Sequence, residues 1–223
     1  MRRPAACLFD LDGLLLDTEP LHSAAWQQAS QQFGLQLSLE QLLALRGRRR
    51  LDCAEQVRRW IADAGLPVPT TPELLAIRQP IAEQLLPKAQ PIPGACALVA
   101  ACQLQSIPMA MVTSSSRAAV ALKAAPHPWL SAIAVRVHGD DPHLAAGKPE
   151  PDPYLLAADR LGVPVEQCWA FEDSLAGAQS ALAAGCIVHV LVPTDGEGAA
   201  MLATTFADGC KVIHALSDIK LPS

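Results

Sequence analysis

Short apolar runs recur along the chain, and each ends at polar residues, glycine or proline. Five of them have the length and composition of buried strands: ACLFD, MAMVTS, IAVRVHG, CWAFED and CIVHVLVP. Helical patterns separate several of these runs, as in SRAAVALKAA, PDPYLLAADRLG and SLAGAQSALAAG. Strands that alternate with helices indicate a parallel sheet covered on both faces. We therefore predict an α/β fold with a doubly wound parallel sheet.

The stretch from about Leu14 to Leu86 departs from this alternation. It holds four helical patterns, LHSAAWQQASQQFG, LSLEQLLALRG, RLDCAEQVRRWIADAG and TPELLAIRQPIAEQLL, with no strand between them. The segment PKAQPIPG then returns the chain to the α/β part, because its prolines resist both helix and central strand. We predict an all-helical cap at residues 16–87, inserted after the first strand. Residues 1–15 and 88–223 would form a Rossmann-like catalytic core.

Composition narrows the classes of protein that the chain can represent. It has 223 residues, of which 51% are apolar, so a sizeable core can form. The net charge of −5 argues against a general nucleic-acid binder, which usually carries a broad basic surface. No uncharged apolar run reaches roughly 18 residues, so we expect no membrane span. Arg2 and Arg3 resemble the start of a signal peptide, but Asp10 and Asp12 interrupt the apolar stretch and argue against one.

Seven cysteines are present, and no two have C-x-x-C spacing. Most lie in apolar runs, which favours buried free thiols over disulfides. We therefore expect a reducing cytoplasmic location. The sequence carries no signal for the oligomeric state, and a monomer is the default expectation.

Polar groups gather at the ends of the predicted strands. Asp10 and Asp12 point the same way because they lie two apart on a strand, and Gly13 then permits an unusual turn. The other three groups are Thr113 with Ser114, Ser115 and Ser116; Lys148 in AAGKPEPDPY; and Glu172 with Asp173. Each of the four groups alone has a plain structural explanation: turn acids, a helix N-cap, a surface lysine, and acids at a helix N-terminus, respectively.

The carboxyl ends of parallel strands meet at one crevice, where ligands bind. Carboxylates suit Mg²⁺, and hydroxyls, free backbone N–H groups and a lysine suit phosphate. The convergence of all four groups therefore indicates a site for Mg²⁺ and a small phosphorylated metabolite.

Four segments of the chain resemble the ordered motifs of the haloacid dehalogenase superfamily: DLDGLLLDTEPLH, VTSSS, GKPEPDPY and FEDSLAGAQSALAAG. The helical insertion resembles the cap of the branch that contains β-phosphoglucomutase and sugar phosphatases. The stretch HGDDPHLAAGKPEPDPYLL also resembles the corresponding region of glycerol-phosphate and pseudouridine-monophosphate phosphatases.

This resemblance implies a role for each matching residue. Asp10 would be the nucleophile that forms an aspartyl-phosphate, and Asp12 would be the general acid and base. Thr113 and Ser114 would bind phosphate oxygens, while Lys148 would balance charge in the transition state. The metal ligands, for Mg²⁺, would be Asp10, the backbone carbonyl of Asp12, Glu172 and Asp173. Asp17 matches the last acid of the first motif, either as a clamp on the turn or as an ordinary turn acid.

Two cap residues are candidates for substrate contact. Arg50 matches an arginine that contacts the distal phosphate in β-phosphoglucomutase-like caps, and His22 falls where that branch often keeps a histidine. The arginines of LRGRRRLD could equally form a solvated face, and His22 could be packed or exposed.

The leading expectation is a magnesium-dependent phosphatase for a phosphosugar or nucleoside monophosphate. A sugar phosphomutase uses the same two aspartates, so the motifs do not separate the two activities. A non-enzymatic phospho-acceptor resembling a receiver domain is a third alternative, against which Asp12 and the cap argue.

Overall fold

A computed structural model describes residues 3–194, 206 and 209–222. In this part of the chain, six parallel strands form one sheet in the order β3-β2-β1-β4-β5-β6. The strands are β1 (Ala6–Phe9), β2 (Met109–Val112), β3 (Val135–Val137), β4 (Cys168–Glu172), β5 (Ile187–Leu191) and β6 (Lys211–Ile213). The predicted doubly wound parallel sheet is confirmed.

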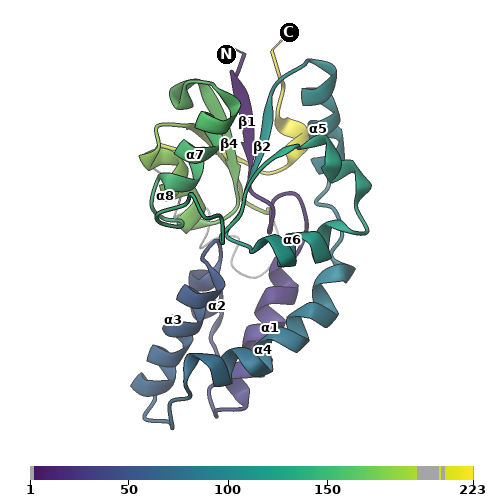
Figure 1. Ribbon diagram of the computed structural model, residues 1–223. Coiled ribbons are helices and arrows are strands. Elements are labelled where there is room, and N and C mark those ends of the chain that lie inside the picture. The colour runs from purple at the N-terminus through teal and green to yellow at the C-terminus, as the bar shows by residue number, and fades with distance from the viewer. Residues whose placement is uncertain (1–2, 195–205, 207–208, 223) are drawn as a thin grey trace.

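Helices cover both faces of the sheet (Figure 1). Successive side chains of a strand point to opposite faces, so β1 separates two cores. Cys7 and Phe9 pack in the core beneath α5 (Ala95–Leu104) and α6 (Arg117–Ala124). Ala6 and Leu8 pack in the opposite core, beneath α7 (Asp152–Leu161) and α8 (Leu175–Ala183). Because both faces of the sheet are buried, its central strands consist almost entirely of apolar residues.

Between β1 and β2 the chain leaves the sheet and forms four helices, which make up the cap (Figure 1). They are α1 (Glu19–Gln31), α2 (Leu39–Leu45), α3 (Arg50–Asp63) and α4 (Thr71–Leu85). The cap has its own apolar core, in which Trp26, Val57 and Leu74 are buried. Ser38 and Thr70 begin α2 and α4 with capping boxes. The four helices predicted for the insertion are therefore present, whereas its exact boundaries remain a prediction.

Two linkers join the cap to the sheet, and they lie side by side. The backbone N–H of Ile92 donates to the carbonyl of Leu15 at 3.1 Å, and that of Asp17 donates to the carbonyl of Gln90 at 2.8 Å. The Asp17 side chain is exposed, so a clamp role for it has no support from burial.

Several short elements complete the described structure. Four 3₁₀ helices lie at Leu86–Lys88, Pro128–Ala132, Val165–Gln167 and Leu216–Asp218. All seven cysteines are free. Among the described residues, no helix is both long enough and apolar enough to span a bilayer.

Candidate active site

The polar groups expected at the strand ends do meet at one edge of the sheet. Asp10 directly follows β1, Thr113 directly follows β2, and Glu172 is the last residue of β4. The three strands are adjacent and parallel, so the three side chains leave the sheet at the same edge. The cap lies beyond this edge (Figure 1).

Lys148 connects all three of these strand ends. Its fully buried ammonium Nζ donates to Oδ1 of Asp10 at 2.5 Å, to the carbonyl of Val112 at 2.9 Å, and to Oε1 of Glu172. Burial alone would lower the pKa of Lys148, but the two carboxylates outweigh it and raise the pKa above its usual value. The lysine is therefore a fixed positive charge beside Asp10.

Asp10, Glu172 and Asp173 form a buried acidic cluster in which one oxygen of each residue lies within 4.8 Å of the others. Burial, with repulsion from neighbouring carboxylates, raises the pKa values of Asp10 and Asp173 well above the usual range. Lys148 supplies one positive charge against three carboxylates, so a divalent cation would balance the remainder. Hard oxygen ligands of this kind suit Mg²⁺. The Asp12 carboxylate lies outside the cluster, and a role for its backbone carbonyl remains a prediction.

Two glycines let the chain pass close to these acids. Gly13 has a φ of +85°, and a Cβ built on it would lie 2.0 Å from Oδ2 of Asp173. A Cβ on Gly177 in α8 would lie 2.0 Å from the carboxylate of Glu172. Glu172 also accepts hydrogen bonds from the hydroxyls of Tyr154 and Ser174, so its position is fixed by several donors.

Asp12 lies in a different electrostatic environment. Its Oδ1 accepts from the Thr18 hydroxyl at 2.6 Å and lies 3.3 Å from Nε2 of His22, and its Oδ2 accepts from the Ser115 hydroxyl at 2.8 Å. The ammonium of Lys123 contacts both oxygens. Burial opposes ionisation of Asp12, but Lys123 and His22 outweigh it and hold the pKa well below its usual range.

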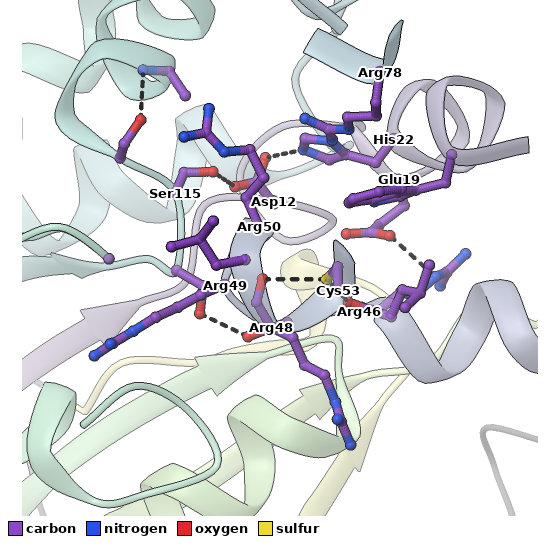
Figure 2. A pocket seen from close by; sticks show the side chains of 18 of the residues that line it. Asp12, Glu19, His22, Arg46, Arg48, Arg49, Arg50, Cys53, Arg78 and Ser115 are labelled. Atoms are coloured by element: carbon purple, nitrogen blue, oxygen red, sulfur yellow. Dashed lines mark hydrogen bonds and ion pairs between the residues drawn. The ribbon is translucent and has the colours of Figure 1, made fainter. Parts of the chain in front are cut away.

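The His22 ring lies between Asp12 and a buried arginine. Its Nδ1 lies 2.7 Å from Nη2 of Arg78. Because arginine can only donate, Nδ1 is the acceptor and Nε2 carries the proton that points to Asp12. The sequence left His22 as either a substrate contact or a packed residue, and the structure places it against the Asp12 carboxylate (Figure 2).

The VTSSS segment forms the turn between β2 and α6. The Thr113 hydroxyl accepts from the backbone N–H of Ser115 at 3.1 Å and donates to Oδ2 of Asp12 at 3.3 Å. The Ser114 hydroxyl donates to the carbonyl of Gly47 in the cap at 2.7 Å. Ser116 caps the N-terminus of α6 through the N–H of Ala119. The turn therefore touches Asp12 on one side and the cap on the other.

A cavity of about 320 Å³ lies between the cap and the sheet edge, and both Asp10 and Asp12 line it. Five arginines line the same cavity, in the arrangement that Figure 2 shows: Arg46, Arg48, Arg49, Arg50 and Arg78. Nε of Arg46 lies 3.3 Å from Oε2 of Glu19. Burial raises the pKa of Glu19 to about 7, although the positive charge of Arg46 opposes this shift.

Arg50 and Arg49 make different contacts in the cavity. Arg50 is exposed and donates to Gln79 in α4 at 2.9 Å. Arg49 packs against Gly147, beside Lys148, and its Nε and Nη2 are buried with no hydrogen-bond partner among the described residues. The cavity is therefore rich in donors suited to an anionic ligand.

Sequence reasoning missed several residues of this site. Lys123 and Arg78 lie outside the four motifs, in helices where the sequence does not distinguish them from ordinary helix residues. Glu19 and Tyr154 lie inside the motifs DLDGLLLDTEPLH and GKPEPDPY, but nothing in the sequence assigns either of them a role. Each becomes visible only when the fold brings its helix against the strand ends.

The chain is similar to known proteins in both sequence and fold. The sequence profile of the haloacid dehalogenase-like hydrolases matches residues 4–185. The chain is 35% identical over 197 residues to a Drosophila melanogaster protein named "Probable pseudouridine-5'-phosphatase". The matched segment covers 86% of this chain and 83% of that protein. The chain is also 35% identical over 185 residues to the fructose-1-phosphate phosphatase of Escherichia coli, covering 82% of this chain and 94% of that one.

A solved structure shares the fold across almost the whole chain. It is the β-phosphoglucomutase of Clostridium difficile, with a TM-score of 0.80, 17% identity, and coverage of 97% of this chain and 93% of that one. From the profile match and these relatives, the chain belongs to the haloacid dehalogenase-like hydrolase family and is a phosphoric monoester hydrolase.

Proposed function

We propose that this chain is a magnesium-dependent phosphatase that hydrolyses a small phosphorylated metabolite through an aspartyl-phosphate on Asp10. One observation carries the proposal: Asp10 and Asp12 line one cavity but lie in different surroundings. Asp10 is paired with Lys148 inside the acidic cluster, whereas Asp12 lies among hydroxyl, imidazole and ammonium donors. Two carboxylates in different environments can perform two different roles.

In the first step, a carboxylate oxygen of Asp10 attacks phosphorus, and the bond from phosphorus to the alcohol oxygen breaks. In the substrate-free protein Lys123 and His22 favour the ionised form of Asp12, whereas a phosphate anion bound beside it raises the pKa of Asp12, which then takes up a proton. Asp12 gives this proton to the departing alcohol, which leaves poorly as an alkoxide. Thr113 and the backbone N–H of Ser114 bind phosphate oxygens, and Lys148 balances the added negative charge.

In the second step, water attacks the aspartyl-phosphate. Asp12, now a carboxylate, takes a proton from this water, and the bond between phosphorus and Asp10 breaks. Inorganic phosphate leaves and Asp10 is regenerated. Asp12 thus returns to its protonated state, so protons and charges balance over the cycle.

Asp10, Asp173 and the backbone carbonyl of Asp12 would hold Mg²⁺, with Glu172 as a direct or water-mediated ligand. When bound, the ion supplies positive charge that lowers the repulsion between a carboxylate and a phosphate ester. The excess of buried carboxylates over ammonium groups in the cluster supports this assignment.

The substrate class that we propose is a phosphosugar or a nucleoside monophosphate. The names of the two relatives support it, because one refers to pseudouridine 5'-phosphate and the other to fructose 1-phosphate. The arginines of the cavity offer donors to such an anion, and His22 and Arg50 are the cap residues that we propose as contacts.

We also propose that the chain works in a reducing, cytoplasmic compartment. Its seven cysteines are all unpaired, and most of them lie in apolar runs of the sequence.

Phosphate release from a substrate panel tests the proposed activity. The purified chain is incubated with phosphosugars, nucleoside monophosphates and p-nitrophenyl phosphate, in Mg²⁺ or in EDTA. We expect release of inorganic phosphate in Mg²⁺ and none in EDTA. The absence of release from every ester would contradict the proposal. Isomerisation of a sugar monophosphate without release, in the presence of a sugar bisphosphate, would show a phosphomutase instead.

A further inference from the structure

Lys123 is a buried lysine that no motif identifies. It lies in α6 and is fully shielded from solvent. Its ammonium contacts both carboxylate oxygens of Asp12, one of them at 2.6 Å, and donates to the Ser115 hydroxyl at 2.7 Å. An ammonium has three donors, and these three oxygens satisfy them. Burying a charge costs free energy unless the charge is paired. The buried ammonium of Lys123 therefore depends on its contacts with Asp12 and Ser115.

The donors to Asp12 come from two parts of the protein. Thr18 and His22 contact Oδ1, and they belong to the linker and to α1, at the base of the cap. Ser115 contacts Oδ2 and belongs to the core. Lys123 also belongs to the core, and it is the residue that contacts both oxygens. In Figure 2, the Ser115 hydroxyl and the His22 ring lie on opposite sides of the Asp12 carboxylate.

This division has a consequence for movement of the cap. Linkers that pair side by side allow a cap to pivot as a unit, and Thr18 and His22 would move with it. The contacts from Lys123 and Ser115 stay with the sheet. The orientation of Asp12 relative to Asp10 is therefore set from the core side, by these two residues together with the Thr113 hydroxyl, which donates to Oδ2 at 3.3 Å.

We propose that Lys123 is a positioning residue for Asp12. It holds the Asp12 carboxylate against the core, facing the cavity that Asp10 also lines, whatever contacts the cap makes. This inference rests on the proposed function, in which Asp12 moves the proton of the leaving alcohol. Lys123 itself does not line the cavity.

The test replaces the ammonium with an apolar chain of similar length, Lys123→Met, and compares two esters. An alkyl phosphate needs a proton on its leaving oxygen, whereas p-nitrophenolate leaves with little help. We expect kcat/KM to fall about 100-fold for the alkyl ester and about 10-fold or less for p-nitrophenyl phosphate. The matched control is Lys88→Met, which removes an exposed lysine and is expected to change neither value.

A double-mutant cycle separates positioning from general support of the fold. If Lys123 acts through Asp12, it has no role once Asp12 cannot transfer a proton. The double variant Asp12→Asn with Lys123→Met should therefore match Asp12→Asn alone within about twofold. Losses that multiply, or equal losses on both esters, would overturn the positioning role.

A second variant and a wild-type control complete the test. If Lys123→Met fails to fold by circular dichroism, Ser115→Ala tests the same contact, with the larger loss again expected on the alkyl ester. Equal losses on both esters in that variant would overturn the inference. The wild-type chain is assayed in parallel: if it releases no phosphate from either ester, the proposed function fails and the inference fails with it. An active wild type with an unaffected Lys123→Met overturns the inference alone.

Discussion

The ammonium Nζ of Lys148 lies 2.5 Å from Oδ1 of Asp10, although the two residues are 138 positions apart in the chain. The same ammonium contacts the carbonyl that ends β2 and a carboxylate oxygen of Glu172 at the end of β4. One buried charge therefore joins three adjacent strand ends. It orients the proposed nucleophile and balances part of the negative charge of the cluster.

Replacing this charge, as in Lys148→Met, should damage both catalysis and stability. The variant leaves Asp10 and Glu172 buried without their cation, and breaking a buried pair costs ~3–5 kcal/mol. We expect kcat to fall by about 10³-fold or more. Chemical denaturation in EDTA measures the free energy of unfolding. Adding Glu172→Gln should recover part of the stability but no activity, and a Lys148→Met variant as stable as the wild type would contradict this account.

Asp173→Asn should have opposite effects on the metal-free and metal-bound protein. Burial and neighbouring acids raise the pKa of Asp173, so its charge destabilises the metal-free fold at neutral pH. The variant should melt at a higher temperature than the wild type in EDTA. It should also lose the stabilisation by Mg²⁺, which for the wild type is ~2.7 kcal/mol at a hundred times the Kd. Differential scanning calorimetry measures both effects, and an undiminished Mg²⁺ shift would exclude Asp173 as a ligand.

Glu19 should make the stability of the metal-free protein depend on pH. Its pKa is raised from 4.5 to about 7 in the folded state, chiefly by burial. Between these values the folded state binds more protons than the unfolded state, so the contribution of Glu19 to stability falls as pH rises. Glu19→Gln removes this titration. The stability of the variant relative to the wild type should therefore increase between pH 4.5 and pH 7 in urea titrations with EDTA. A constant difference across this range would disagree with the shifted pKa.

Arg50→Ala tests whether the cap contacts the substrate. Arg50 lines the cavity from the cap, where it donates to Gln79 in α4, so its loss should weaken binding more than chemistry. We expect KM for the best phosphosugar to rise about tenfold, with kcat changed by less than threefold. Arg59→Ala on the same helix is the control, because Arg59 is exposed and does not line the cavity. Unchanged KM values for every phosphosugar would remove Arg50 from the substrate contacts.

Local pattern in the sequence was enough to predict five of the six strands of the described sheet and the four cap helices. The apolar runs of the central strands are continuous because both faces of the sheet are buried, and the cap helices bury apolar residues in a core of their own. The grouping of Asp10, Thr113, Lys148, Glu172 and Asp173 followed from the rule that parallel strands end at one edge.

Other elements gave weaker signals. The helix α5 has the sequence ACALVAACQL, in which apolar residues occupy almost every position, so no helical period stands out. The strand β6 has only three residues, two of them exposed, and it adds to the outer edge of the sheet. The predicted strand IAVRVHG is reduced to Val135–Val137, since only these residues pair with β2.

The role of Lys123 could not be predicted for a different reason. A lysine near the end of a helix is ordinarily a solvated residue, and the sequence of α6 does not distinguish this one. Its partner Asp12 lies 111 positions away, so only the packing of α6 against the strand ends shows that its charge is buried.

The most direct test of the central claim is the rate of magnesium-dependent phosphate release by Asp10→Asn on the best substrate of the wild type. An amide cannot replace the carboxylate as a nucleophile, although it occupies nearly the same volume. We predict that release falls to background, while circular dichroism shows a folded protein. Substantial magnesium-dependent phosphatase activity in this variant would contradict an aspartyl-phosphate on Asp10 and, with it, the proposed mechanism.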